Sequence, residues 1–279
     1  MWSYWFSPQD SNTPATLATA TPTPDAATAA TAATVTPTPA DIHEAAQLVA
    51  AAMFHTTSYA EIFRDEESRL EALTFLFECN LRLVAAKCPS AVHICKEEGV
   101  VVCVFMLCRT GSGHFTMWEK VVSGGILQLT LRYGWRVLYR LVRTSDFFDA
   151  QDGQIMGAAE VGSAEVAAAG TGAVTAPAAA AGAVPPKTGP VPYLLLQRMA
   201  VTPLKQGGGV GSRYLGKALE QADREGTRVL LATQEERNLT FYRRRGFEVV
   251  KEVQYVPDDP HPAYKSWFMI REPTKINDL

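Results

Sequence analysis

Apolar residues in the second half of the chain form two short runs separated by an amphipathic stretch. The runs 194–201 and 228–233 have the length of strands, and the second lacks polar alternation, so we expect it to be buried on both faces of a sheet. Between the runs, apolar positions recur at helical spacing over 210–222, and Gly226 stands where such a helix would end. This order predicts two strands joined by a helix.

The first half of the chain predicts helices and a hairpin. The first helix spans 41–54, with Asp41 as its N-cap and Glu44 as the partner in a capping box. The remaining predicted elements are a helix over 69–83, strands 91–95 and 100–108 around the turn 96–99, a helix over 121–142 with a weak point at Gly124 and Gly125, and a closing strand over 267–271.

Composition places most of the chain in one globular domain. Of its 279 residues, 47% are hydrophobic, which is enough to bury a full core. Two segments differ: 12–40 is almost entirely Thr, Pro and Ala, and 151–190 is rich in Ala and Gly. We therefore expect residues 1–40 to be disordered and 41–279 to form a single domain with a low-complexity insertion at about 151–190.

Charge and hydropathy exclude several partners. The net charge of −3 and the pI near 6.0 leave no basic footprint for nucleic acid. Lys and Arg are absent before Arg64, and the aromatic stretch 1–6 is too short to cross a bilayer. We expect a cytoplasmic protein without a membrane span, whose oligomeric state the sequence leaves open.

All five cysteines lie between Cys79 and Cys108. His93 and Cys95 share one strand face, and Cys103 can face them across the hairpin, so a metal site is one interpretation. Apolar strands more often bury reduced thiols. We expect free thiols and no metal.

The turn between the first apolar run and its helix is rich in glycine. Glycines at a helix start let several backbone N–H groups approach one anion, and the helix dipole favours negative charge there. Lys205 and Arg213 add positive charge beside the turn. The turn therefore predicts a phosphate site, although a flexible turn ahead of an ordinary helix has the same composition. A P-loop would require Gly-Lys-Ser/Thr, and a dinucleotide motif would require glycine where Tyr214 stands.

Asn238 and Tyr242 lie four residues apart, on one face of a short predicted helix over 238–245 that Gly246 ends. A tyrosine hydroxyl can protonate a departing thiolate, and coenzyme A contains both a thiol and a pyrophosphate. The alternatives are a tyrosine packed under the sheet and an asparagine that caps its helix.

Together these motifs resemble the GCN5-related N-acetyltransferase (GNAT) superfamily, and within it members of the puromycin N-acetyltransferase type. The resemblance is strong over 192–273 and weaker over 40–143. It implies an α/β (α+β) fold with a mixed, mostly antiparallel sheet, flanked by helices and splayed where two parallel strands diverge. It also implies a first strand before Asp41, where the sequence marks it poorly. It also implies an N-acetyltransferase that moves an acetyl group from acetyl-CoA to a primary amine by direct attack on the thioester.

The resemblance assigns roles to individual residues. Backbone groups of Met199, Ala200 and Val201 would hold the pantetheine arm. The pyrophosphate would bind at Gln206, Gly207, Gly208, Gly209, Val210, Gly211 and Ser212. Asn238 would line the cofactor slot, and Tyr242 would contact the cofactor and act as the catalytic acid. Relatives often have a glutamate where this chain has Ala232, which puts any role of that carboxylate in doubt.

The proton acceptor and the acetyl acceptor are less defined. His261, Glu61, His55 and Glu235 are candidate bases, and transfer through water is an alternative. By resemblance, residues 55–65 and 258–264 would border the acceptor pocket. We expect a small-molecule amine as acceptor. The alternatives are a peptide N-terminus, a non-catalytic acyl-CoA-binding module and a domain that binds another nucleotide.

Overall fold

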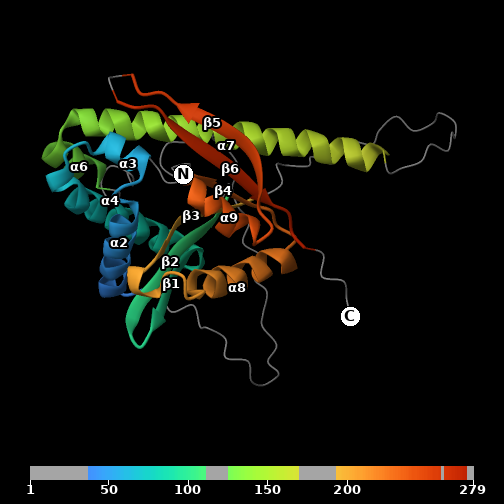
Figure 1. Cartoon of the computed structure of the whole chain (residues 1–279), viewed down its shortest axis with the longest axis horizontal. Coiled ribbons are helices and arrows are strands. Elements are labelled where there is room, and N and C mark those ends of the chain that lie inside the picture. The colour runs from blue at the N-terminus through green and yellow to red at the C-terminus, as the bar shows by residue number, and fades with distance from the viewer. Residues whose placement is uncertain (1–36, 111–124, 170–192, 259–260, 275–279) are drawn as a thin grey trace, which may run out of the picture.

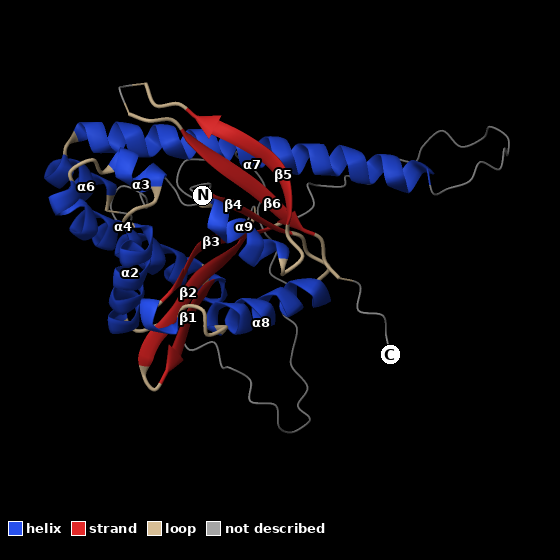
Figure 2. Ribbon diagram, in the orientation of Figure 1, coloured by secondary structure: helices blue, strands red, loops and turns tan. Residues whose placement is uncertain are grey.

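The computed structural model describes residues 37–110, 125–169, 193–258 and 261–274. These residues form a six-stranded sheet in the order β1-β2-β3-β4-β6-β5, flanked by helices (Figures 1 and 2). The strands are β1 (Val92–Glu97), β2 (Val100–Arg109), β3 (Leu194–Val201), β4 (Val229–Thr233), β5 (Glu248–Tyr255) and β6 (Tyr264–Arg271). The helices are α2 (Pro39–Met53), α3 (Thr57–Ile62), α4 (Glu66–Lys87), α6 (Ile126–Tyr133), α7 (Trp135–Ala169), α8 (Val210–Arg224) and α9 (Glu236–Arg243), with short 3-10 turns η1 (Pro89–Ala91) and η2 (Pro203–Lys205).

Every pair of neighbouring strands is antiparallel except β3 and β4. Parallel neighbours need a crossover connection, which α8 supplies. β3 has the predicted bounds, and β4 begins one residue later than predicted. The predicted fold class, a mixed and mostly antiparallel sheet flanked by helices, is confirmed.

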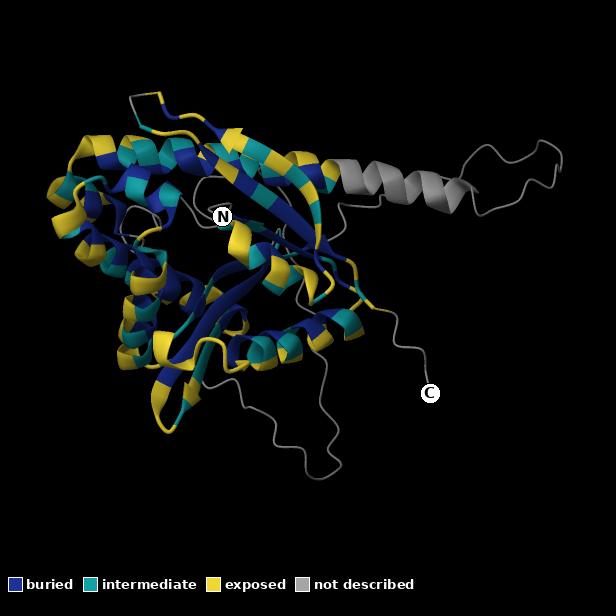
Figure 3. Ribbon diagram, in the orientation of Figure 1, coloured by how far each residue is buried: buried dark blue, intermediate teal, exposed yellow. Residues whose placement is uncertain are grey.

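Helices cover both faces of the sheet. Consecutive residues of β2 point to opposite faces, so Val104 packs with Leu73 under α2 and α4, whereas Phe105 packs with Leu215 under α8. α7 runs along the end of the sheet that contains β5 and β6, where Phe148 enters a third core (Figure 1). Figure 3 shows the buried residues concentrated in the strands and on the helix faces that meet them.

The start of α2 differs from the prediction. Its N-cap is Thr38, whose hydroxyl accepts from the Asp41 amide at 3.2 Å while Asp41 accepts from the Thr38 amide at 3.1 Å. Asp41 is thus the third helical residue and completes the capping box. Glu44 instead accepts from the Val101 amide at 2.9 Å and ties α2 to β2.

The predicted helix over 121–142 is wrong in its extent. Gly134, with φ of +86°, separates α6 from α7, and Gly125, with φ of +69°, precedes α6. Residues 111–124 lie outside the described part of the chain. α7 then continues to Ala169, so the first part of the expected low-complexity insertion is helical. Alanine has the highest helix propensity, and Ile155 buries its side chain beside β3–β6, which gives this stretch both local and tertiary support.

The β1–β2 hairpin forms as predicted and pairs Cys95 with Cys103. All five cysteines are free thiols. His93 stacks on Phe105 with 4.5 Å between ring centroids, and burial lowers the pKa of His93 to about 4. Within the described ranges, no group of three or more His, Cys, Asp and Glu side chains is placed to hold a metal. No helix in those ranges has the length and apolar character needed to cross a membrane. The expected first strand falls mostly in residues 1–36, outside the described part.

Candidate active site

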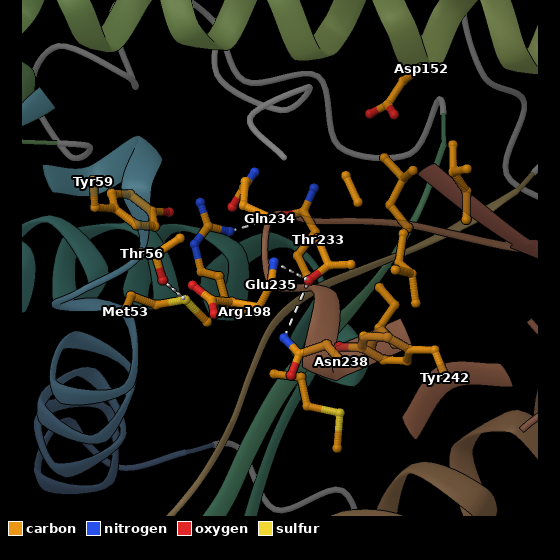
Figure 4. Close-up of a pocket in the computed structure, with 17 residues that line it drawn as sticks. Met53, Thr56, Tyr59, Asp152, Arg198, Thr233, Gln234, Glu235, Asn238 and Tyr242 are labelled. Atoms are coloured by element: carbon orange, nitrogen blue, oxygen red, sulfur yellow. Dashed lines mark hydrogen bonds between the residues drawn. The ribbon is translucent and has the colours of Figure 1, made fainter. Parts of the chain in front are cut away.

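β3 and β4 run side by side for three residue pairs and then separate. Their pairing begins at Leu194 opposite Val229 and ends at Leu196 opposite Leu231. From there β3 continues along β2 only, and β4 continues along β6 only. A pocket opens at this divergence (Figure 4). Its lining residues are Met53, Thr56, Tyr59, Asp152, 195–199, 230–235, Asn238 and Tyr242.

A bulge in β3 brings two consecutive polar side chains to one face of the strand. Arg198 has φ of 52°, and the register between β2 and β3 shifts at this point. On a regular strand, consecutive side chains point to opposite faces. Here Arg198 Nη1 donates to Gln197 Oε1 at 3.0 Å, and the two residues are 4% and 6% exposed. The two polar residues that interrupt the apolar run therefore both line the pocket.

The glycine turn has a shape that can hold an anion. Gly207 and Gly209 have φ of +77° and +78°, a region that glycine enters without strain, and a Cβ built on either would meet no heavy atom within 4 Å. The first helical hydrogen bond of α8 joins the Arg213 amide to the Gly209 carbonyl at 2.9 Å. The amides of residues 210–212 therefore point out of the helix end and can donate to a ligand. This geometry fits the pyrophosphate of coenzyme A.

Close packing holds this turn beside β3. A Cβ on Gly211 would lie 3.0 Å from both Met199 Cε and Val201 Cγ2, so α8 approaches the strand most closely at a residue without a side chain. Gln206 Nε2 donates to the Val201 carbonyl at 2.9 Å. The helix start is thereby held at the edge of the diverging strands.

The cations near the turn are already paired in part. Lys205 lies 3.3 Å from Glu97 on the β1–β2 hairpin, and Arg213 pairs with the same carboxylate. This carboxylate offsets the positive charge that the sequence places beside the turn. Arg245 donates to the Ser212 hydroxyl and stacks on Phe241, which puts a further cation at the first turn of α8.

Asn238 and Tyr242 both line the pocket from α9, as their spacing predicts. Asn238 is not the N-cap of α9, because Glu235 holds that position. Instead Asn238 Nδ2 donates to Thr233 Oγ1 at 3.2 Å, and the Glu235 amide donates to the same hydroxyl at 3.3 Å. These bonds fix the end of β4 against the start of α9.

Two aromatic neighbours hold the Tyr242 ring. Phe241 and Phe247 make edge contacts with it at centroid distances of 5.1 Å and 5.7 Å. Burial raises the pKa of Tyr242 to about 12, although Arg245 opposes the rise. The phenol therefore stays protonated near neutral pH, which is the form that a proton donor requires.

Of the four candidate bases, Glu235 alone is among the residues that line the pocket, and it also lies 3.6 Å from Arg237. Glu61 is buried and lies 3.4 Å from Arg64 and 3.9 Å from Arg140. His55 is exposed beside Phe54, and His261 Nδ1 lies 3.3 Å from the Pro262 carbonyl. The geometry does not bring these groups together as a relay.

Several pocket residues were missed from the sequence. Asp152 was assigned to the low-complexity insertion, and its position on α7 appears only once that helix is seen to continue. Gln234 follows a predicted strand, where a polar side chain at a strand end could have been noticed. Thr56 and Tyr59 belong to residues 55–65, which were expected to border the acceptor pocket, and both line it. Asp258 belongs to the other expected border segment, 258–264, and instead pairs with Arg143 and accepts from the Tyr139 hydroxyl.

Comparison with known proteins agrees with this fold. Residues 145–249 match the family model of the acetyltransferase (GNAT) domain, which includes β3, the glycine turn, β4 and α9. This part of the chain is therefore similar to the GNAT acetyltransferase domain, and the match covers less than half of the 279 residues. The narrower similarity to the puromycin N-acetyltransferase type stays a prediction.

Solved structures give more distant likenesses. An acetyltransferase structure from Corynebacterium glutamicum, described as histone acetyltransferase HPA2 and related, is 17% identical with a TM-score of 0.46, over 85% of this chain and 93% of that one. The polyamine N-acetyltransferase of Drosophila melanogaster is 12% identical with a TM-score of 0.40, over 68% and 79%. The ribosomal-protein-S18-alanine N-acetyltransferase of Escherichia coli is 16% identical with a TM-score of 0.27, over 31% and 57%, so the chain spans little more than half of that enzyme.

Proposed function

We propose that this chain is an N-acetyltransferase that transfers an acetyl group from acetyl-CoA to the primary amine of a small molecule. The observation that carries the proposal is the divergence of β3 from β4, with the glycine turn at one edge and Tyr242 on the wall of the pocket between them. In this arrangement, 206–212 would hold the pyrophosphate, and backbone groups of 199–201, with Asn238, would line the pantetheine arm.

The proposed reaction is a single displacement at the thioester. The neutral amine nitrogen attacks the carbonyl carbon, a C–N bond forms and the C–S bond breaks. Because β3 separates from β4 after Leu196, the Met199–Val201 segment has no β4 partner, and its backbone amides on that side would be the donors for the oxyanion. Tyr242 donates its proton to the departing thiolate, and the product is an amide plus free coenzyme A.

The proton that the amine loses passes to a base, and one proton must return to the Tyr242 phenolate before the next turnover. Glu235 and Asp152 are carboxylates on its wall, and water can carry the proton onward. Burial raises the pKa of Asp152, which makes this carboxyl a better proton acceptor than an ordinary surface aspartate.

The test is release of free thiol from acetyl-CoA in the presence of a panel of primary amines, with the acetylated product identified by mass. The proposal predicts thiol release that depends on both the amine and the protein. A non-catalytic acyl-CoA-binding module, which the Ala232 departure favours, predicts tight binding of coenzyme A and no turnover with any amine. That second result would overturn the catalytic proposal.

A further inference from the structure

The acceptor side of the pocket contains a cluster of hydrogen-bond donors, formed by Arg198, Gln234 and Tyr59. They come from the β3 bulge, the end of β4 and α3, and converge in Figure 4. Arg198 and Tyr59 are 4% and 1% exposed, so both are held away from bulk water. We call these three residues the donor cluster.

Arg198 is an unusual group to find on the wall of a pocket. Its guanidinium lies over the Phe77 ring at 5.7 Å, beside the Tyr59 hydroxyl, and donates to Gln197 Oε1. Burial lowers the pKa of Arg198, because a charged group loses hydration in this position. A planar guanidinium presents a fork of N–H donors that matches a carboxylate.

Gln234 adds a second donor at the same place. Its Oε1 accepts from Ser58 Oγ at 3.5 Å, which orients the amide group. Its Nε2 is buried and, among the residues that the structure describes, has no hydrogen-bond partner. A buried N–H group without a partner is unfavourable, so a ligand oxygen at this position would stabilise the site.

Acidic side chains also lie in and around the pocket. Glu61 Oε1 is engaged by Arg64 and Arg140. Asp152 belongs to α7 and Glu235 to the start of α9, so both come from elements other than the bulge that presents Arg198. The pocket thus contains both a group of hydrogen-bond donors and two carboxylates, which suits a substrate with one anionic and one amine group.

We propose that the donor cluster binds a carboxylate of the acetyl acceptor, so that the acceptor is an amino acid or another small amine that carries a carboxylate. This inference rests on the proposed function for the identity of the ligand as an acetyl acceptor. The acceptor carboxylate accepts from Arg198 and from Gln234 Nε2, and its amine extends toward the diverging strands.

Matched pairs of amines test the proposal. Each pair has the same skeleton and differs only in a carboxylate or the corresponding carboxamide. In the thiol-release assay, the wild-type chain is expected to show a KM about 10- to 100-fold lower for the carboxylate member, the range expected for hydrogen bonds to a charged group. Arg198→Met should abolish that preference, Arg198→Lys should reduce it, and Gln234→Leu should weaken it about tenfold or less, while the KM for acetyl-CoA stays unchanged.

Arg82→Met is the matched control, because Arg82 lies on α4, pairs with Glu78 and is absent from the pocket wall. It should keep the full preference for the carboxylate. Melting temperatures identify any variant that fails to fold. If Arg198→Met does not fold, Gln234→Leu, which changes a residue just after β4, provides the second test. Equal KM values for the two members of each pair in the wild-type chain would overturn the proposal.

Calorimetry separates this proposal from the proposed function. Carboxylate-bearing amines are titrated into the chain in the presence of coenzyme A, where no transfer occurs. Binding that depends on Arg198, without turnover on any amine, would support the carboxylate site and reject the acetyltransferase. Turnover on amines with no effect of the carboxylate or of Arg198 would support the acetyltransferase and reject the carboxylate site.

Discussion

Tyr242 illustrates how position and protonation combine in one side chain. A phenol beside a leaving thiolate is useful only while it holds its proton. The rings of Phe241 and Phe247 pack against it, and the burial of the side chain raises its pKa to about 12. The helix that presents Tyr242 was predicted from the sequence, whereas this environment requires the packed core.

Replacing Tyr242 with phenylalanine removes the hydroxyl that we propose as the proton donor and keeps the aromatic ring. We expect kcat to fall about 100-fold, within the usual range for general acid catalysis, with the dissociation constant for coenzyme A changed less than threefold. Tyr139→Phe is the control, because the Tyr139 hydroxyl donates to Asp258 at 2.8 Å and lies outside the pocket wall. An unchanged kcat in Tyr242→Phe would contradict the assignment.

The raised pKa of Tyr242 also predicts the alkaline behaviour. The folded pKa of about 12 exceeds the unfolded value near 10, so the associated stability is complete below about pH 10 and is lost as the pH rises through 12. Over pH 8 to 10, kcat of the wild-type chain should therefore not fall through loss of this proton. An alkaline limb near pH 10 that disappears in Tyr242→Phe would show that the phenol is not protected.

Arg198 marks a limit of sequence reasoning at this scale. A strand pattern assumes that side chains alternate with a period of two, so Gln197 and Arg198 would be assigned to opposite faces. The bulge cancels one step of that alternation and turns both into the pocket. Nothing in a single sequence marks a bulge whose left-handed residue is an arginine.

At the scale of elements, α8 is fixed at both ends. Its start packs on β3 through Gly211, and its end is tied to β6 by Asp223 and Arg271. The Arg271 guanidinium donates to both oxygens of Asp223 at 2.7 Å, and the side chains of Arg271 and Asp223 are 10% and 11% exposed. The Thr274 amide donates to Asp223 as well, at 2.8 Å.

Asp223→Asn is expected to destabilise the fold by roughly 3 kcal/mol, because it leaves a largely buried guanidinium without its carboxylate. Hydrogen bonding to Arg271 lowers the pKa of Asp223. The stabilisation should therefore be complete above about pH 4, the unfolded value, and be lost as the pH falls through the lower folded value. Urea denaturation at pH 7 and pH 3 measures both effects.

Arg132→Gln is the comparison for this ion pair, because Arg132 and its partner Glu71 are each about half exposed. It should change the free energy of unfolding far less at both pH values. Equal losses for Asp223→Asn and Arg132→Gln would contradict the stabilising role given to the α8–β6 contact.

The helices show where sequence patterns succeed and where they fail. The bounds of α8 follow from its apolar spacing and from Gly226, and the structure agrees within a few residues. The α2 start was misplaced because Thr38 and Asp41 are both good N-caps and the deciding bonds are local geometry. The predicted weak point at Gly124 and Gly125 coincides with the start of α6, whereas the break between α6 and α7 at Gly134 was not predicted.

At the scale of the whole molecule, the pocket exists because two parallel strands share only three residue pairs. The divergence joins elements that are far apart in the sequence, from Tyr59 on α3 to Asp152 on α7 and Tyr242 on α9. The proposed cofactor side could be inferred from the sequence, because its glycines, Asn238 and Tyr242 lie close together in one segment. The acceptor side was not, because its residues meet only through tertiary packing.

The central claim is that coenzyme A binds with its pyrophosphate on the glycine turn, and a calorimetric titration of coenzyme A tests it most directly. The wild-type chain should bind coenzyme A, and ATP should compete poorly. Gly209→Val should weaken binding at least tenfold, because a β-branched residue resists φ of +78° and its side chain would enter the open space at the turn.

Gly216→Ala is the control in the same helix, since a Cβ at Gly216 meets no heavy atom within 4 Å and alanine favours the helix. Its affinity for coenzyme A should equal that of the wild-type chain. The account is contradicted if the wild-type chain gives no binding heat with coenzyme A or acetyl-CoA, or if a folded Gly209→Val variant binds as tightly as the wild type.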